Sequence, residues 1–176
     1  METTESGAGP TRESLMLALN VKLLREQNLP LGILAGAVAA LLGALLWMGI
    51  TVATGMEFGL VAIAIGAGVG YAVRYAGKGV TKVFGVVGAI FTLLSCVGGE
   101  VLSVIQMVAN ADGYSFFEAL SKTDLSIAIP KILESFSIIT YVIYGIGIYE
   151  GYKFSFRKLT PQEIQEAGLA PTSTMP

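Results

Sequence analysis

Three glutamates are the residues whose type and spacing could do chemistry in a membrane. Glu57, Glu100 and Glu134 each stand beside a long apolar run. At ~1.5 Å per residue of helix, each lies roughly 24–27 Å from the charged boundary at the other end of its run. The hydrocarbon core of a bilayer is about 30 Å thick, so all three are expected at or just under the same interface.

Such a cluster could form an acidic vestibule that gathers cations on the outer side of a membrane. The plainer alternative is that the three glutamates only end the apolar runs. Charges at helix ends cost little free energy, whereas charges at the bilayer centre cost much. We favour this alternative. No ionisable residue falls clearly at the centre of an apolar run, which argues against a proton-coupled transporter.

A second group of candidates is basic and stands at the opposite ends of the runs: Arg74, Lys78, Lys82, Lys153, Arg157 and Lys158. The first three recur every four residues, although Gly77 and Gly79 interrupt a continuous helix. These side chains could bind anionic lipid headgroups, at about 1 kcal/mol each, or an acidic partner. The alternative, which we favour, is the ordinary basic excess of cytoplasmic loops.

The composition argues against catalysis, cofactors, metals and nucleic acid. The chain of 176 residues has no histidine, which is the commonest general base and metal ligand. Its single cysteine, Cys96, lies in an apolar run, as expected of a small buried hydrophobe. Neither Ser95 nor Cys96 has a base in reach by spacing. The net charge of −2, without a basic patch, is not that of a nucleic-acid binder.

The elements that position these residues are apolar runs long enough to cross a bilayer. Hydrophobic residues make up 53% of the chain and charged residues only 14%. We predict an all-α, polytopic membrane protein with a domain over residues 31–151. Its four transmembrane helices form a bundle and cover residues 31–53, 58–75, 83–102 and 130–150. Residues 1–10 are expected to be a disordered lead, and residues 152–176 a cytoplasmic tail.

Two further helices are expected outside the spans. Residues 11–29 read as a helix, lying either on the membrane surface or plainly in the cytoplasm before the first span. Residues 103–129 form the outer loop. Within it, Ser115 and Glu118 have capping-box spacing and would start a short helix. Pro130 suits the first turn of the fourth span, where its missing N–H leaves no hydrogen bond unmade.

The distribution of basic residues predicts the orientation. Of the eleven Lys and Arg, only Lys122 and Lys131 fall on one side of this topology, which leaves nine on the other. Cytoplasmic loops carry the basic excess, so both termini are expected in the cytoplasm. Trp47 falls near the outer end of the first span, where an amphipathic ring is favoured.

Small residues at helical spacing predict close helix packing. Three such pairs are present: Gly32 and Gly36, Gly66 and Gly70, Gly147 and Gly151. In lipid, pairs of this kind let two helix backbones approach each other. The spacing leaves open whether they pack within one chain or between chains.

Two passages resemble a known group of proteins. They are Ile65-Gly-Ala-Gly-Val-Gly-Tyr-Ala-Val-Arg74, followed by Gly77-Lys-Gly79, and the ending Ile143-Tyr-Gly-Ile-Gly-Ile-Tyr-Glu-Gly-Tyr-Lys153. Together they are similar to small, uncharacterised bacterial four-helix inner-membrane proteins, over residues 31–158. The resemblance implies a bacterial cytoplasmic (inner) membrane and attaches no activity.

These observations favour a non-enzymatic integral membrane subunit or scaffold. It would contact membrane lipids and pack with itself as a homo-oligomer, or with partner membrane proteins. The alternative is an oligomeric channel or small transporter with the acidic outer vestibule, because four helices alone barely enclose a path. A stoichiometric partner would favour the first hypothesis, and ion flux that depends on the three glutamates would favour the second.

Overall fold

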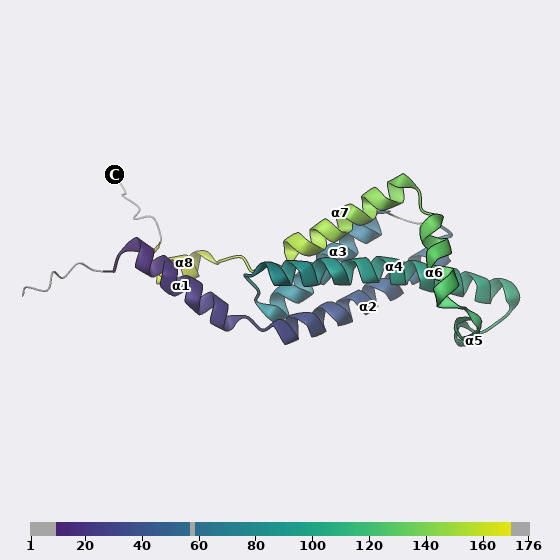
Figure 1. Cartoon of the computed structure of the whole chain (residues 1–176), viewed down its shortest axis with the longest axis horizontal. Helices are drawn as coiled ribbons and strands as arrows, with labels where there is room; N and C mark the ends of the chain where they lie inside the picture. The colour runs from purple at the N-terminus through teal and green to yellow at the C-terminus, as the bar shows by residue number, and fades with distance from the viewer. Residues whose placement is uncertain (1–9, 57–58, 170–176) are drawn as a thin grey trace, which may run out of the picture. The chain divides into compact units, whose positions relative to one another are not determined.

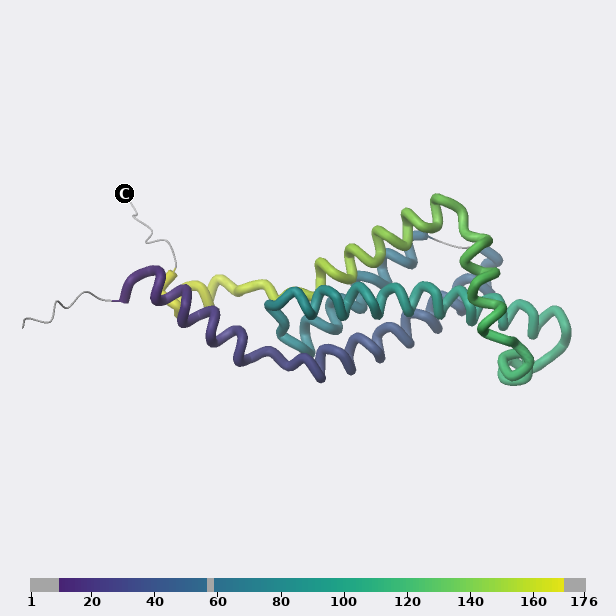
Figure 2. Tube along the Cα trace, in the orientation of Figure 1, coloured from purple at the N-terminus to yellow at the C-terminus, as the bar shows by residue number. Residues whose placement is uncertain are grey.

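The computed structural model describes residues 10–56 and 59–169, and each regular element in these ranges is an α-helix. They divide into two compact units, one formed by Asn28–Arg157 and the other by the residues on either side of it. Figures 1 and 2 follow the chain through its helices, α1 (Arg12–Glu26), α2 (Leu29–Thr54), α3 (Gly59–Gly77), α4 (Lys82–Asp112), α5 (Phe116–Lys122), α6 (Leu125–Glu134), α7 (Ile138–Phe154) and α8 (Pro161–Glu166).

The larger unit holds the helices that could cross a membrane. α2, α3 and α4 are each long and apolar enough to do so. α6 and α7 together make a fourth candidate, although the chain bends by 106° between them. α7 alone has 17 residues, the lower end of the length that spans a bilayer. The fold is therefore that of an all-helical membrane protein with three candidate spans, or four if the bent pair is one.

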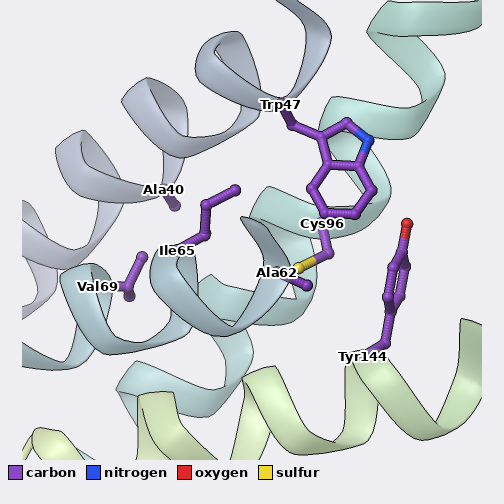
Figure 3. Packing of buried hydrophobic residues seen from close by; sticks show 7 residues of the cluster. All are labelled: Ala40, Trp47, Ala62, Ile65, Val69, Cys96 and Tyr144. Atoms are coloured by element: carbon purple, nitrogen blue, oxygen red, sulfur yellow. The ribbon is translucent and has the colours of Figure 1, made fainter. Parts of the chain in front are cut away.

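α2, α3, α4 and α7 run side by side, and α6 lies across the end of this bundle (Figure 1). α4 contacts the other three long helices, and α3 packs against both α2 and α7. The buried core lies between them and is drawn in Figure 3. The cluster shown there consists of Ala40, Trp47, Ala62, Ile65, Val69, Cys96 and Tyr144. A second buried cluster, between α4, α5 and α6, consists of Val101, Ile105, Ala109, Ala119 and Ile132.

The ends of α2 follow from local chemistry. The Asn28 side chain accepts a hydrogen bond from the Leu31 N–H at 3.0 Å, which caps the helix, and Pro30 occupies its first turn. At the other end Gly55 takes a left-handed conformation with φ of +66°. Glycine adopts that conformation without the steric penalty that a Cβ would bring.

α4 is longer than the predicted span. It continues through Asp112, whereas the apolar pattern placed the end of the span at 102. Residues 103–112 contain no glycine or proline that would end the helix. The helix therefore stops only where Gly113, with φ of +72°, closes it. The segment expected as loop 103–129 is thus mostly helical: the end of α4, then α5, then the start of α6.

The predicted fourth span is two helices. α6 starts at Leu125 because the Asp124 side chain caps it, accepting the Ser126 N–H at 2.9 Å. Pro130 consequently lies inside α6, and its predicted place in a first turn is wrong. α7 starts afresh because the Ser137 hydroxyl accepts the Thr140 N–H at 3.2 Å.

The smaller unit contains α1 and α8. Thr11 caps α1 by accepting the Ser14 N–H at 3.3 Å. α8 begins with a complete capping box, in which Thr160 and Glu163 each bind the other's backbone N–H. The helix expected over residues 11–29 corresponds to α1, and its position on a membrane surface stays a prediction. Most of the expected disordered lead, residues 1–9, lies outside the described residues.

Candidate functional site

The glycines of α3 and α7 pack these two helices together. Gly66 faces the carbonyl oxygen of Gly147, where an added Cβ would overlap it. One turn further, a Cβ on Gly70 would lie 2.7 Å from the Gly151 carbonyl oxygen. Backbones that approach this closely leave room only for hydrogen at Cα, and such contact is a main source of helix association in lipid.

The remaining predicted pair lies on α2. A Cβ on Gly32 would stand 3.0 Å from the Phe84 ring, and one on Gly36 would stand 2.8 Å from the Phe91 ring. All six glycines singled out by their spacing therefore meet other helices of the same chain. These faces are used in building one bundle, and they are not left exposed for a second copy.

Trp47 and Glu100 form a polar contact inside the bundle. The indole N–H of Trp47 donates to a carboxylate oxygen of Glu100 at 3.0 Å. Trp47 is 2% exposed and Glu100 is 6% exposed. The rings of Tyr144 and Trp47 pack in a T-shaped contact, with their centroids 5.7 Å apart (Figure 3). Trp47 thus faces the interior of the bundle as a hydrogen-bond donor, and its depth near the outer end of the first span stays a prediction.

The three glutamates differ in their surroundings. Glu100 lies in the interior, 12 residues before α4 ends at Asp112, so it does not end that helix. Glu134 is exposed as the last residue of α6. Glu57 lies outside the described residues. Within residues 10–56 and 59–169, no three His, Cys, Asp or Glu residues are placed to hold a metal ion. The acidic vestibule stays a prediction.

Three of the six basic candidates share one pocket. Arg74, Lys78 and Arg157 line a common pocket with the ring of Tyr75. The other three are not among its lining residues: Lys82 begins α4, Lys153 pairs with Glu150 at 3.5 Å, and Lys158 belongs to the smaller unit.

The surface of the larger unit carries an apolar groove of about 480 Å³. We call it the α2–α4 groove, because those helices form its sides, while residues of α5 and α6 close one part of it. Small residues line it on both sides: Ala37, Ala40 and Ala44 from α2, Ser95 and Gly98 from α4. Ala40, Ala44 and Ser95 are buried within the bundle, whereas Ala37 and Gly98 are partly exposed. An apolar groove of this size lies within the range of typical binding sites. Sequence reasoning missed it, although the spacing of the three alanines along α2 was visible.

Comparison with protein-family models, curated proteins and solved structures finds no match. The likeness to bacterial inner-membrane proteins therefore stays a resemblance of residue pattern.

Proposed function

We propose that the chain is a non-enzymatic, four-span protein of the bacterial cytoplasmic membrane, with both termini in the cytoplasm. We further propose that it acts as a subunit or scaffold by receiving one transmembrane helix of a partner membrane protein in the α2–α4 groove. Three spans would be α2, α3 and α4, and the fourth would be α7, with α6 lying at the outer interface. The basic excess on the side of the two termini supports this orientation.

The groove is the observation that carries the proposal. In lipid there is no hydrophobic drive between helices, so association depends on backbones that approach closely over small residues. The chain's own small-xxx-small faces are already filled by its own helices. Ala37 on α2 and Gly98 on α4 are partly exposed small residues that line the groove, whereas Ala40 and Ala44 are buried within the bundle.

A partner helix fits the α2–α4 groove better than a lipid chain does. A flexible acyl chain adapts to large side chains as easily as to small ones, so it gives no reason for the small residues Ala37 and Gly98 at the open part of the groove. A helix presents a ridge of side chains that needs a groove of matching pitch. A second copy of this chain remains a distinct outcome of the test, and it would favour the oligomeric channel.

The experiment compares two neighbouring leucines of α2. Leu41 lines the groove and is 60% exposed, whereas Leu42 is not among the lining residues and is 62% exposed. A benzophenone amino acid at position 41 is expected to cross-link one membrane protein, and the same group at position 42 only lipid. Native mass spectrometry of the unmodified complex should then show that protein at fixed stoichiometry.

A second experiment fills the groove by substitution. A Cβ at Gly98 would meet only the Ala44 methyl, at 3.9 Å, so Gly98→Leu should fold. It is expected to abolish the complex while leaving the Tm of the isolated chain unchanged within error. Equal cross-linking from positions 41 and 42, or a complex that persists in Gly98→Leu, would contradict binding of a partner helix in the groove.

A further inference from the structure

A second apolar pocket lies between α4 and α6 and has a volume of about 280 Å³. Four branched aliphatic residues of α4 form one wall: Val101, Val104, Ile105 and Val108. α6 contributes Lys131 and Ile132 to the opposite wall. We call this site the Lys131 pocket. The α2–α4 groove shares two of the α4 residues but takes other residues from α6, so the two sites lie on adjoining faces of these helices.

The wall of the Lys131 pocket differs from that of the groove. Val101, Ile105 and Ile132 are buried in the second core cluster, which fixes the floor of the pocket. Val104 and Val108 are 37% and 46% exposed and form an open apolar rim. Large branched side chains keep a second helix backbone at a distance, and close approach is what helix association in lipid requires. A flexible acyl chain needs no such approach.

Helix contacts indicate the level of this pocket in a membrane. α2 and α4 run in the same direction, because Gly36 lies against Phe91 and Trp47 lies against Gly99. The apolar helix α2 ends seven residues beyond Trp47. At the same rise per residue, that end is level with about residue 106 of α4, which falls within the wall of the pocket. The pocket therefore lies where a membrane-spanning α2 would reach the headgroups.

Lys131 supplies the charge of the pocket. Of the described residues that line it, Lys131 alone carries a charged side chain. This side chain is exposed and, within the part of the chain that the structure describes, forms no ion pair, although Glu134 follows three positions later. Thr123 also lines the pocket, but its hydroxyl donates to the Ala119 carbonyl at 2.8 Å. The Lys131 ammonium is thus the donor that the pocket offers to a ligand.

These features match an amphiphile with one negative charge. A lysine at a membrane interface lays its methylene stem on apolar surface and keeps its ammonium at the polar level. In this pocket such a lysine faces an aliphatic wall at the level of the headgroups, where a lipid changes from phosphate to acyl chain. At ~30 Å³ per water the pocket has room for about nine waters, which is part of one chain. Sites for drug-sized ligands start at about 300 Å³.

We propose that the Lys131 pocket binds one anionic phospholipid of the leaflet that adjoins α6. The Lys131 ammonium holds the phosphate through a charge-assisted hydrogen bond, and the upper part of one acyl chain lies along the aliphatic wall of α4. This binding requires that the bundle spans a membrane, as proposed above, and it does not depend on the partner helix in the groove. A free fatty acid would present a carboxylate and a chain to the same pocket, so the experiment separates the two sources.

The experiment measures lipid bound to the full chain in mild detergent by native mass spectrometry. The probes are phosphatidylglycerol, phosphatidylcholine with the same acyl chains, and oleate. The wild type is expected to retain one phosphatidylglycerol about fivefold more tightly than phosphatidylcholine, which is the effect of one charge. Lys131→Gln should remove this preference and Lys131→Arg should keep it. Lys122→Gln is the matched control, because Lys122 ends α5 nearby and does not line the pocket.

A second variant tests the apolar part of the pocket. Ala128 lines it, so Ala128→Leu should weaken retention of both phospholipids about tenfold, as if two methylenes lost their contact. The Tm of each variant should stay within error of the wild type, and cross-linking from position 41 reports on the groove separately. Equal losses in Lys131→Gln and Lys122→Gln, or equal retention of the two phospholipids by the wild type, would overturn the site. Displacement of phosphatidylglycerol by an equal concentration of oleate would overturn the assignment to a phospholipid.

Discussion

Two glycines of α3, separated by a single residue, differ in whether they contact another helix. Gly66 faces the Gly147 carbonyl with no room for a methyl group. Gly68 has no atom within 4 Å of where its Cβ would stand. Composition alone treats both as glycines of an apolar helix. The bundle distinguishes them, because one lies under α7 and the other faces away from it.

Gly66→Ala and Gly68→Ala are therefore expected to change stability in opposite directions. Alanine at 66 must push α7 away from α3, and overpacking of this kind costs about 1–3 kcal/mol or more. Alanine at 68 meets nothing and should stabilise the helix by up to ~1 kcal/mol, the difference in helix propensity. Reversible unfolding in mixed micelles measures both. A Gly66→Ala variant as stable as Gly68→Ala would contradict the α3–α7 contact.

At the residue scale, spacing predicted that the six glycines would pack and the structure shows what they touch. It could not predict the partner of Trp47. An indole near a span end usually belongs to the interface, and nothing in the order of residues brings Glu100, 53 positions away, beside it. The pairing depends on how α2 and α4 are aligned, which is decided by the packing of both helices at once. For the same reason spacing could not predict that Arg74 and Lys78, at the end of α3, share a pocket with Arg157, which follows α7.

The N-cap of α6 is Asp124, whose side chain can be titrated. The Asp124 carboxylate accepts the Ser126 hydroxyl at 2.6 Å and the Ser126 N–H at 2.9 Å. These two hydrogen bonds lower the pKa of Asp124 below its ordinary value of 3.8, and the bond from the Ser126 hydroxyl has the larger effect. A carboxyl with a lowered folded-state pKa stabilises the fold fully above its unfolded pKa, and the effect is lost as the pH falls through the lowered value.

The amide protons of Ile127 and Ala128, bonded to the Asp124 carbonyl, should therefore lose protection from exchange as the pH falls below 3.8. Asp124→Asn keeps an acceptor and should remove this acid dependence, whereas Asp124→Ala should lose protection at neutral pH. The start of α7 is an internal control, because its cap is the hydroxyl of Ser137, which does not titrate there. Hydrogen exchange followed by mass spectrometry measures both starts. A parallel loss at α6 and α7 would argue against the cap.

Element boundaries show where sequence reasoning worked and where it stopped. The start of α2 and its end near Thr54 were predicted to within two residues, because Pro30 and Gly55 are strong local signals. The break at Ser135 to Ser137 was not predicted. An apolar run from 130 to 150 looks continuous to a hydropathy window, and the cap that restarts the helix at Ser137 is one hydroxyl within it.

For the whole molecule, the bent α6–α7 pair decides whether the number of spans is odd or even. Single cysteines at Lys122 and Lys158 separate the cases, since native Cys96 is buried and out of reach of a thiol reagent. With four spans, a membrane-impermeant maleimide should label Lys122→Cys on intact cells, and should label Lys158→Cys only after the membrane is opened. Arg12→Cys, also predicted inside, is the control. Labelling of Lys158→Cys on intact cells would reduce the spans to three and place the C-terminal end outside.

Because Trp47 is buried between helices, its fluorescence reports on the packing of the bundle. The chain contains one tryptophan among its 176 residues, so all indole fluorescence arises from a single point between α2, α4 and α7. Tyr144 stands within energy-transfer range of that ring and reports on the position of α7. Separation of the helices would shift the emission to longer wavelengths and weaken the transfer. Assembly and disassembly of this fold can thus be followed in a lipid vesicle without any label.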